Sequence, residues 1–156
     1  MKILFIGNYV KNREYIFPIL KKKSKYIDLI DTQTMFFRKY KILNFIFYRL
    51  SPFFFEHYIN NFILKKTKDK YDLIFVKSSE FISENLIKEL KTRSKKIIAY
   101  IHDNPFIKRD KKRWSFFKNA AAHYDKLVFI QKSRIGLAKK NNLKNTYLVW
   151  PSFEQH

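Results

Sequence analysis

KKIIAYIHDNPF, residues 95–106, is the stretch that decides the fold class of this chain. Five consecutive apolar residues, Ile97 to Ile101, stand between two lysines and a proline turn, which is typical of a strand covered on both faces of a parallel sheet. In open α/β sheets, ligands bind beyond the carboxyl ends of such strands. His102 and Asp103 follow at once and are therefore candidates for acid–base chemistry. The alternative is that they only shape the turn, where Asp and Asn are common.

Apolar runs and helical patterns alternate along the rest of the chain. Strands are predicted at 2–8, 26–32, 71–76, 96–101, 126–130 and 146–150. Helices are predicted at 13–24, 41–66 with an interruption at Ser51-Pro52, 83–93, 112–123 and 135–141. This alternation predicts an α/β fold: a Rossmann-like doubly wound parallel sheet with helices on both faces, forming one domain over residues 1–150.

Two segments of the chain echo each other. YDLIFVKS (residues 71–78) resembles YDKLVFIQKS (residues 124–133), because each has a Tyr-Asp turn, a strand and then Lys-Ser before the next helix. We expect two equivalent strand–helix units, with Ser78 and Ser133 near helix N-termini, where serine is favoured.

The composition indicates an anionic partner. The 156 residues carry a formal net charge of +20 and include 17 Phe, 10 Tyr and 2 Trp. Nucleic acid, anionic lipid head groups and phosphorylated substrates would all suit such a charge. A nucleotide bias of the source genome is the alternative explanation, since composition alone is a weak warrant.

Composition also excludes several classes of site. The chain has no cysteine, which excludes disulfides and thiolate metal sites, and its two glycines cannot form a Gly-rich phosphate loop. The four histidines show no metal-ligand spacing, so no metal is expected. No apolar run reaches the ~18 residues of a membrane-spanning helix, and the apolar N-terminus is too short for a signal peptide. We therefore expect a cytoplasmic protein or one bound at a membrane surface.

The order of these segments resembles the N-terminal half of a GT-B glycosyltransferase. More narrowly, it is similar to the CgeB-like (spore-maturation-protein type) transferases. The matching stretches are 2–8, 71–93, 96–106 and 113–133. The family's usual Asp-Asp-Pro is Asp103-Asn104-Pro105 here, which leaves open any role that needs a second carboxylate.

This resemblance implies the transfer of a sugar from a nucleotide-sugar to a glycan or lipid-linked acceptor, in the synthesis of a cell-surface polysaccharide. It implies that residues 1–150 form the acceptor-side domain and that residues 151–156 begin an interdomain linker. The donor-binding domain would then lie in the same polypeptide or in a partner chain. The resemblance implies no metal and no cofactor beyond the nucleotide-sugar co-substrate.

Predicted strand ends supply the candidate site. If the reaction inverts, a general base must accept the acceptor's hydroxyl proton, and His102 has a free pKa close to neutrality. Asp103 would orient that imidazole or act as the base itself. Groups suited to sugar hydroxyls or phosphate are Asn8, Lys77, Ser78, Ser79, Asn104, Gln131 and Lys132. For the two lysines, plain solvation is the alternative.

Residues 35–66 are rich in aromatic and basic side chains. Their apolar surface exceeds what one core-facing stripe needs, and flanking cations suit a helix lying in a membrane interface. The expected membrane-facing residues are Phe36, Phe37, Arg38, Lys39 and Lys41. The chain would then be peripheral at the inner face of an anionic membrane. The alternative is ordinary core packing of a long helical hairpin.

Two other functions compete with sugar transfer. A non-catalytic module that binds nucleic acid or a membrane surface would explain the charge and the aromatics. Nucleic acid is disfavoured because no recognised binding signature is present and the lysines are spread along the chain. A receiver- or flavodoxin-like signalling domain ranks last, because Gly7-Asn8 follows the first strand in place of an acidic pair and Lys77 follows the strand at 71–76.

Overall fold

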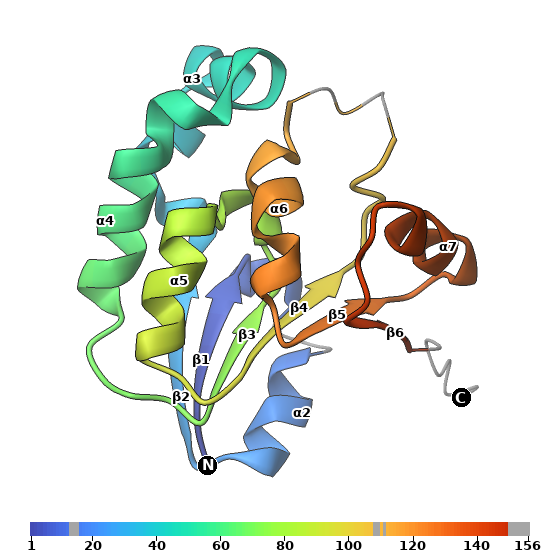
Figure 1. Cartoon of the computed structure of the whole chain (residues 1–156). Coiled ribbons are helices and arrows are strands. Elements are labelled where there is room, and N and C mark those ends of the chain that lie inside the picture. Colours follow the sequence, from blue (N-terminus) through green and yellow to red (C-terminus); the bar gives the residue numbers. More distant parts are fainter. Residues whose placement is uncertain (13–15, 108–109, 111, 150–156) are drawn as a thin grey trace, which may run out of the picture.

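The core of the molecule is a six-stranded, all-parallel sheet. The computed structural model describes residues 1–12, 16–107, 110 and 112–149. Its strands lie in the order β2-β1-β3-β4-β5-β6 (Figure 1). This confirms the predicted α/β class and the Rossmann-like doubly wound sheet. The strands are β1 Lys2–Gly7, β2 Tyr26–Asp31, β3 Leu73–Val76, β4 Ile97–Ile101, β5 Lys126–Phe129 and β6 Thr146–Leu148.

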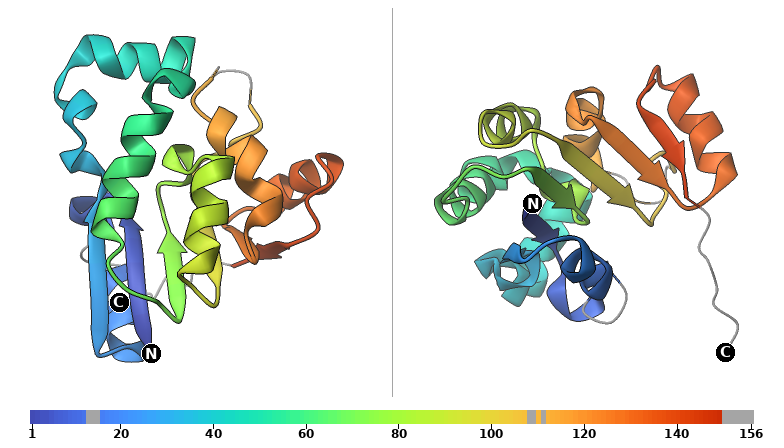
Figure 2. Two further views of the ribbon diagram at one scale, coloured as in Figure 1. Left: turned by 60° about the vertical axis from the view of Figure 1, so that its left-hand side comes forward. Right: turned by 90° about the horizontal axis from the view of Figure 1, so that it is seen from below.

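Helices lie on both faces of the sheet, but unequally. Helices α4 to α7 pack on one face, whereas α2 packs on the other, over β1 and its neighbours (Figure 2). On that second face, no helix of the described residues lies over β4 to β6, where Tyr100, Val128 and Tyr147 stand in register. The helices are α1 Tyr9–Asn12, α2 Ile16–Lys23, α3 Lys41–Phe45, α4 Glu56–Lys66, α5 Glu84–Thr92, α6 Ser115–Ala120 and α7 Lys132–Lys140.

The run at 97–101 serves both faces of β4. Ile97, Ala99 and Ile101 are buried in the main core beneath α5 and α6, while Ile98 and Tyr100 are half-buried on the second face. Alternate residues of a strand point to opposite faces, so a continuous apolar run is required where both faces meet other side chains.

The two Tyr-Asp turns have the same structural role. The Asp72 carboxylate accepts the backbone N–H of Lys2 at 2.8 Å, and the Asp125 carboxylate accepts that of Ile97 at 2.6 Å. Each aspartate therefore satisfies the first backbone donor of a neighbouring strand, which would otherwise lack a partner. The equivalence of the two units is thus visible at the amino edge of the sheet.

The expected serines do not cap the helices. Ser83 caps α5, since its Oγ accepts the backbone N–H of Leu86 at 3.2 Å. Ser133 lies inside α7, which begins at Lys132, three residues before the predicted start. Ser78 precedes only a single 3₁₀ turn, Ser79–Phe81. Lys77-Ser78 therefore follows the end of β3, whereas Lys132-Ser133 opens α7, so Ser133 lies near a helix N-terminus as expected but does not cap it.

The aromatic segment is more broken than one or two helices. After α3 come a π turn, Ile46–Leu50, and a 3₁₀ turn, Pro52–Phe55, before α4 begins. The predicted break at Ser51-Pro52 is present: the Ser51 Oγ accepts the backbone N–H of Phe53 at 3.3 Å. Nowhere in the described residues is there a helix with the length and apolar character needed to cross a bilayer.

Other element ends shift by a few residues. Tyr71 forms an isolated bridge to Ser94, and β3 begins only at Leu73. The predicted helix at 13–24 includes residues 13–15, which lie outside the described residues, as does the proposed linker at 151–156.

Candidate functional site

The carboxyl edge of the sheet gathers the predicted polar residues. Because the strands are parallel, the residues that follow β1, β3, β4 and β5, namely Asn8, Lys77, His102 and Gln131, all lie at this edge. His102 and Asp103 are exposed there, so the corner is open to solvent. The chain connection reverses direction between β1 and β3, which is where ligands bind in sheets of this order.

Gly7 allows β1 and β3 to end close together. A Cβ atom at Gly7 would lie 2.8 Å from the Cβ of Lys77 and 2.9 Å from the Phe5 ring. Real Cβ atoms do not approach that closely, so only glycine fits. The tight contact places the start of the Lys77 side chain directly beside the reversal point.

Lys77 is the most perturbed cation at this edge. Its side chain is partly buried, and its ammonium nitrogen lies 4.1 Å from the centroid of the Tyr100 ring. Burial lowers its pKa from 10.5 to about 8, against the opposing influence of Asp103 and Glu80. A lysine that is kept charged at a cost in stability is a functional-site candidate, because strongly shifted groups cluster at such sites.

The surroundings of His102 favour its neutral form, because they lower its pKa. Loss of hydration lowers its pKa first, and the charges of Lys77 and Arg134 lower it further, while Asp103 acts in the opposite direction. A neutral imidazole can accept a proton near pH 7, as a general base must. The structure thus places a proton acceptor and a cation on neighbouring strand ends.

Asp103 is bound to an arginine rather than to the imidazole. Arg113 donates to the Asp103 carboxylate at 3.1 Å and to Glu80 at 3.2 Å, so it bridges the two acids. Across the described ranges no hydrogen bond joins Asp103 to the His102 ring. In this arrangement Asp103 acts on His102 through its charge and not through a hydrogen bond to the ring.

The remaining predicted binding residues are less well placed. Ser78 and Ser79 are buried, and the Ser78 Oγ lies 3.1 Å from the Thr32 Oγ1. The Asn104 side chain accepts the backbone N–H of Phe106 at 3.0 Å and so shapes its own turn. Gln131 and Lys132 are exposed beyond β5. Of the predicted set, the structure brings together His102, Asp103 and Lys77 most closely.

Two arginines also lie at this edge, and the sequence pattern does not single them out. Arg113 precedes α6, and Arg134 lies in α7 and donates to the backbone oxygen of His102. Both have a buried Nε atom that lacks a hydrogen-bond partner among the described residues. Arginine is far outnumbered by lysine in this chain. The rarity of arginine is the only signal in the sequence that could have pointed to these two residues. Bidentate pairing with carboxylates or phosphates favours arginine over lysine.

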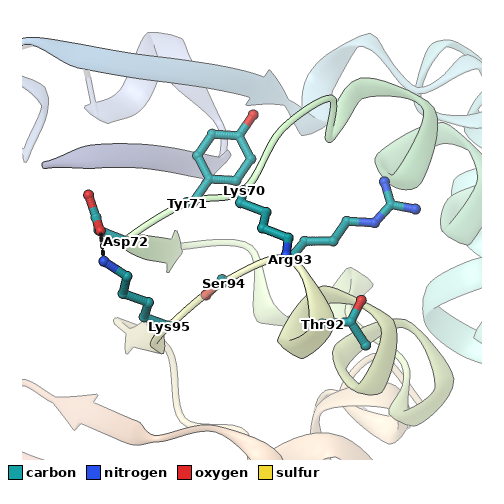
Figure 3. A pocket seen from close by; sticks show the side chains of 7 residues that line it. All are labelled: Lys70, Tyr71, Asp72, Thr92, Arg93, Ser94 and Lys95. Atoms are coloured by element: carbon teal, nitrogen blue, oxygen red, sulfur yellow. Dashed lines mark hydrogen bonds and ion pairs between the residues drawn. The ribbon is translucent and has the colours of Figure 1, made fainter.

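Two hollows open on the surface, at opposite ends of the sheet. One, of about 290 Å³, is lined by Tyr48, Arg49, Asp110 and Arg113 and adjoins the carboxyl edge. The other, of about 350 Å³, lies at the amino ends of β3 and β4 (Figure 3). There the Lys95 ammonium pairs with Asp72 at 2.6 Å, and the Arg93 guanidinium donates to the Thr67 backbone oxygen at 2.7 Å. Asp72, Lys95 and Arg93 of this hollow thus have structural partners.

The expected membrane-facing residues divide into two groups. Phe36, Lys39 and Lys41 are exposed. Phe37 is completely buried in an aromatic cluster with Phe47, Phe55 and Phe81, so it does not face outward. Arg38 also turns inward, where it donates to the Tyr48 hydroxyl and to Gln33. Phe37 and Arg38 point inward because residues Phe36–Lys39 form a 3₁₀ turn. A 3₁₀ turn is wound more tightly than an α-helix, so the spacing of an α-helical face does not predict which of its side chains are buried.

Comparison with known proteins adds no assignment. No protein-family model matches the chain, and no curated protein shows significant similarity to it. Within the described ranges, no group of three or more His, Cys, Asp or Glu side chains is arranged to hold a metal ion.

Proposed function

We propose that this chain is the acceptor-side half of a GT-B-type glycosyltransferase of the CgeB-like kind, acting on the cytoplasmic side of a membrane. It would help to transfer a sugar from a nucleotide-sugar to a glycan or lipid-linked acceptor, without a metal. The observation that supports this most is the open corner at the carboxyl edge. There, an exposed histidine with a lowered pKa lies beside a partly buried lysine.

The residues of the corner divide the work. His102 accepts the proton of the attacking hydroxyl, and Lys77 offsets negative charge on a phosphate-bearing ligand. Arg113 positions Asp103, which keeps a carboxylate near both groups. A second domain, in the same polypeptide or in a partner chain, binds the nucleotide-sugar.

Acceptor binding tests the proposal directly. The full chain is labelled with ¹⁵N and titrated with soluble glycans and with a short-chain prenyl-diphosphate sugar. We expect backbone shift changes at residues 77–80 and 102–104 and at Arg134. Changes confined to the amino edge around Asp72 and Lys95, or no saturable change with any acceptor, would reject the proposal.

His102 provides the kinetic test. In an enzyme assembled with its donor-binding domain, His102→Ala should lower kcat by about 100-fold or more, the usual contribution of a general base. His57→Ala is the matched control, because His57 is an exposed histidine on α4 whose ring pairs with the Asn61 side chain at 2.8 Å. A near-normal kcat for His102→Ala would remove this residue from the base role.

A further inference from the structure

Residues 36–54, here called the aromatic cap, expose an unusual amount of apolar surface. Half of all large hydrophobic side chains that are exposed in the described part of the chain come from this one segment. Ile42 is 71% exposed and Phe54 is 77% exposed. The full set is Phe36, Tyr40, Ile42, Phe45, Leu50, Phe53 and Phe54. Single exposed hydrophobic residues are normal in globular proteins, but such a concentration marks an interaction surface.

Core packing does not account for these side chains. The same segment already supplies Phe37 and Phe47 to the main core, and both are fully buried. Ile42 and Phe45 are three positions apart on the opposite side of α3, so they project away from that core. The aromatic cap therefore has one apolar side that stabilises the fold and a second that stays largely exposed, although Phe36 packs against Tyr58 and Phe53 against Phe116.

The charges of the aromatic cap are all of one sign. No Asp or Glu occurs between Asp31 and Glu56. Lys39, Lys41 and Arg49 are exposed among the apolar residues. This surface therefore attracts anions and would repel a second copy of itself.

The aromatic cap lies at the functional end of the molecule. α3 stands beyond the carboxyl ends of the strands, at the top in Figure 1 and again at the top in the left view of Figure 2. The hollow beside Arg113 also includes Arg49 of this segment. A flat partner that covers the aromatic cap would thus lie close to the open corner.

We propose that the aromatic cap docks on an anionic lipid bilayer. Its apolar side chains enter the boundary between head groups and acyl chains, while the three cations contact lipid phosphates. A bilayer accepts aliphatic and aromatic side chains equally, whereas nucleic acid would use only the aromatic ones for stacking. This binding goes beyond the proposed transferase activity and does not depend on it.

Vesicle co-sedimentation tests the docking. The full chain is mixed at low salt with phosphatidylcholine vesicles that do or do not contain phosphatidylglycerol. We expect saturable binding to the anionic vesicles only. The triple variant Ile42→Ser, Phe45→Ser, Phe54→Ser should bind at least tenfold more weakly. The variant Lys39→Gln, Lys41→Gln, Arg49→Gln should lose roughly 100-fold, since each cation near an anionic surface contributes about 1 kcal/mol.

Ile19→Ser is the matched control, because Ile19 is also an exposed aliphatic residue beside lysines, on α2. It should bind as the wild type does. The altered side chains are exposed, so we expect all variants to fold. A thermal unfolding transition like that of the wild type will show this. The proposal is overturned if the wild-type chain does not bind anionic vesicles, if the triple variant binds normally, or if the aromatic cap retains only DNA or RNA oligomers. Failure of acceptor binding would leave this result untouched.

Discussion

Lys77 is a residue whose charge lowers the stability of the folded protein. Its ammonium lies against the Tyr100 ring in a largely dehydrated position, and its pKa falls to about 8. The attraction of a cation to an aromatic face recovers part of the lost hydration. An apolar side chain of similar length would avoid the cost altogether. The presence of a charge at this strand end therefore fits a role in binding rather than in stability.

Replacing Lys77 by Met should stabilise the protein at pH 7. The shift from 10.5 to about 8 corresponds to about 3 kcal/mol, and residual hydration of the side chain reduces the expected gain to roughly 1–2 kcal/mol. Because the folded state loses the Lys77 proton before the unfolded state does, the destabilising contribution of Lys77 fades between pH 8 and 10.5.

Urea unfolding at several pH values provides the measurement. The advantage of Lys77→Met over the wild type should be largest at pH 7 and should shrink as the pH rises above 8. A variant that is less stable than the wild type at pH 7 would show that the lysine contributes to folding instead.

At the scale of the element, α5 is the helix that the sequence describes best. Its apolar residues Leu86, Ile87 and Leu90 are completely buried, as their spacing along one helical face predicts. Ser83 begins the helix and also donates to the Asn60 side chain at 3.1 Å, which links α5 to α4. One hydroxyl group therefore serves both a helix end and the contact between two helices.

Ser83→Ala should destabilise the protein by about 1–2 kcal/mol. The substitution removes the cap on the Leu86 N–H and leaves both this donor and the Asn60 oxygen without a partner in a buried place. The free energy of unfolding in urea gives the measurement. Ser133→Ala is the control, because Ser133 is exposed on α7 and should change stability by less than about 0.5 kcal/mol. Equal effects of the two changes would contradict the capping role.

For the whole molecule, charge is the dominant feature. Several acidic side chains form ion pairs at the amino edge, where Asp72 pairs with Lys95 and Asp125 with Lys91. The 13 acidic residues cannot balance 33 basic ones, so the folded protein carries a strong positive field. Compaction of so many like charges opposes folding when they are not screened.

Added salt should therefore raise the melting temperature. Between about 0.01 M and 1 M ionic strength, the Debye length falls from about 30 Å to about 3 Å. A gain of about 1–2 kcal/mol corresponds to a rise in Tm of roughly 2–8 °C for a chain of this size. Differential scanning calorimetry in NaCl and in KCl should give the same rise, because screening does not depend on the cation. A Tm that stays constant or falls would contradict this account.

Local pattern predicted much of the fold but only part of the site. The six strands and the break at Ser51 were predictable, because apolar runs and proline act over a few residues. His102 could be proposed as a candidate because the end of a parallel strand is a recurrent position for ligands. Arg113 could not be identified, since its partner Glu80 lies 33 residues away in the chain. The sequence could not show that Phe37 is buried and Phe54 exposed either, because both belong to the same aromatic run.

The sequence by itself determined the class of the fold and the edge of the sheet at which the candidate polar residues gather. Alternating apolar runs require a covered parallel sheet, and a parallel sheet brings every strand end to one side. Tertiary structure alone decided which side chains meet there, and it left one side of the aromatic cap uncovered. The reason is physical: periodicity depends on neighbours in the chain, whereas burial and charge pairing depend on segments that only folding brings into contact.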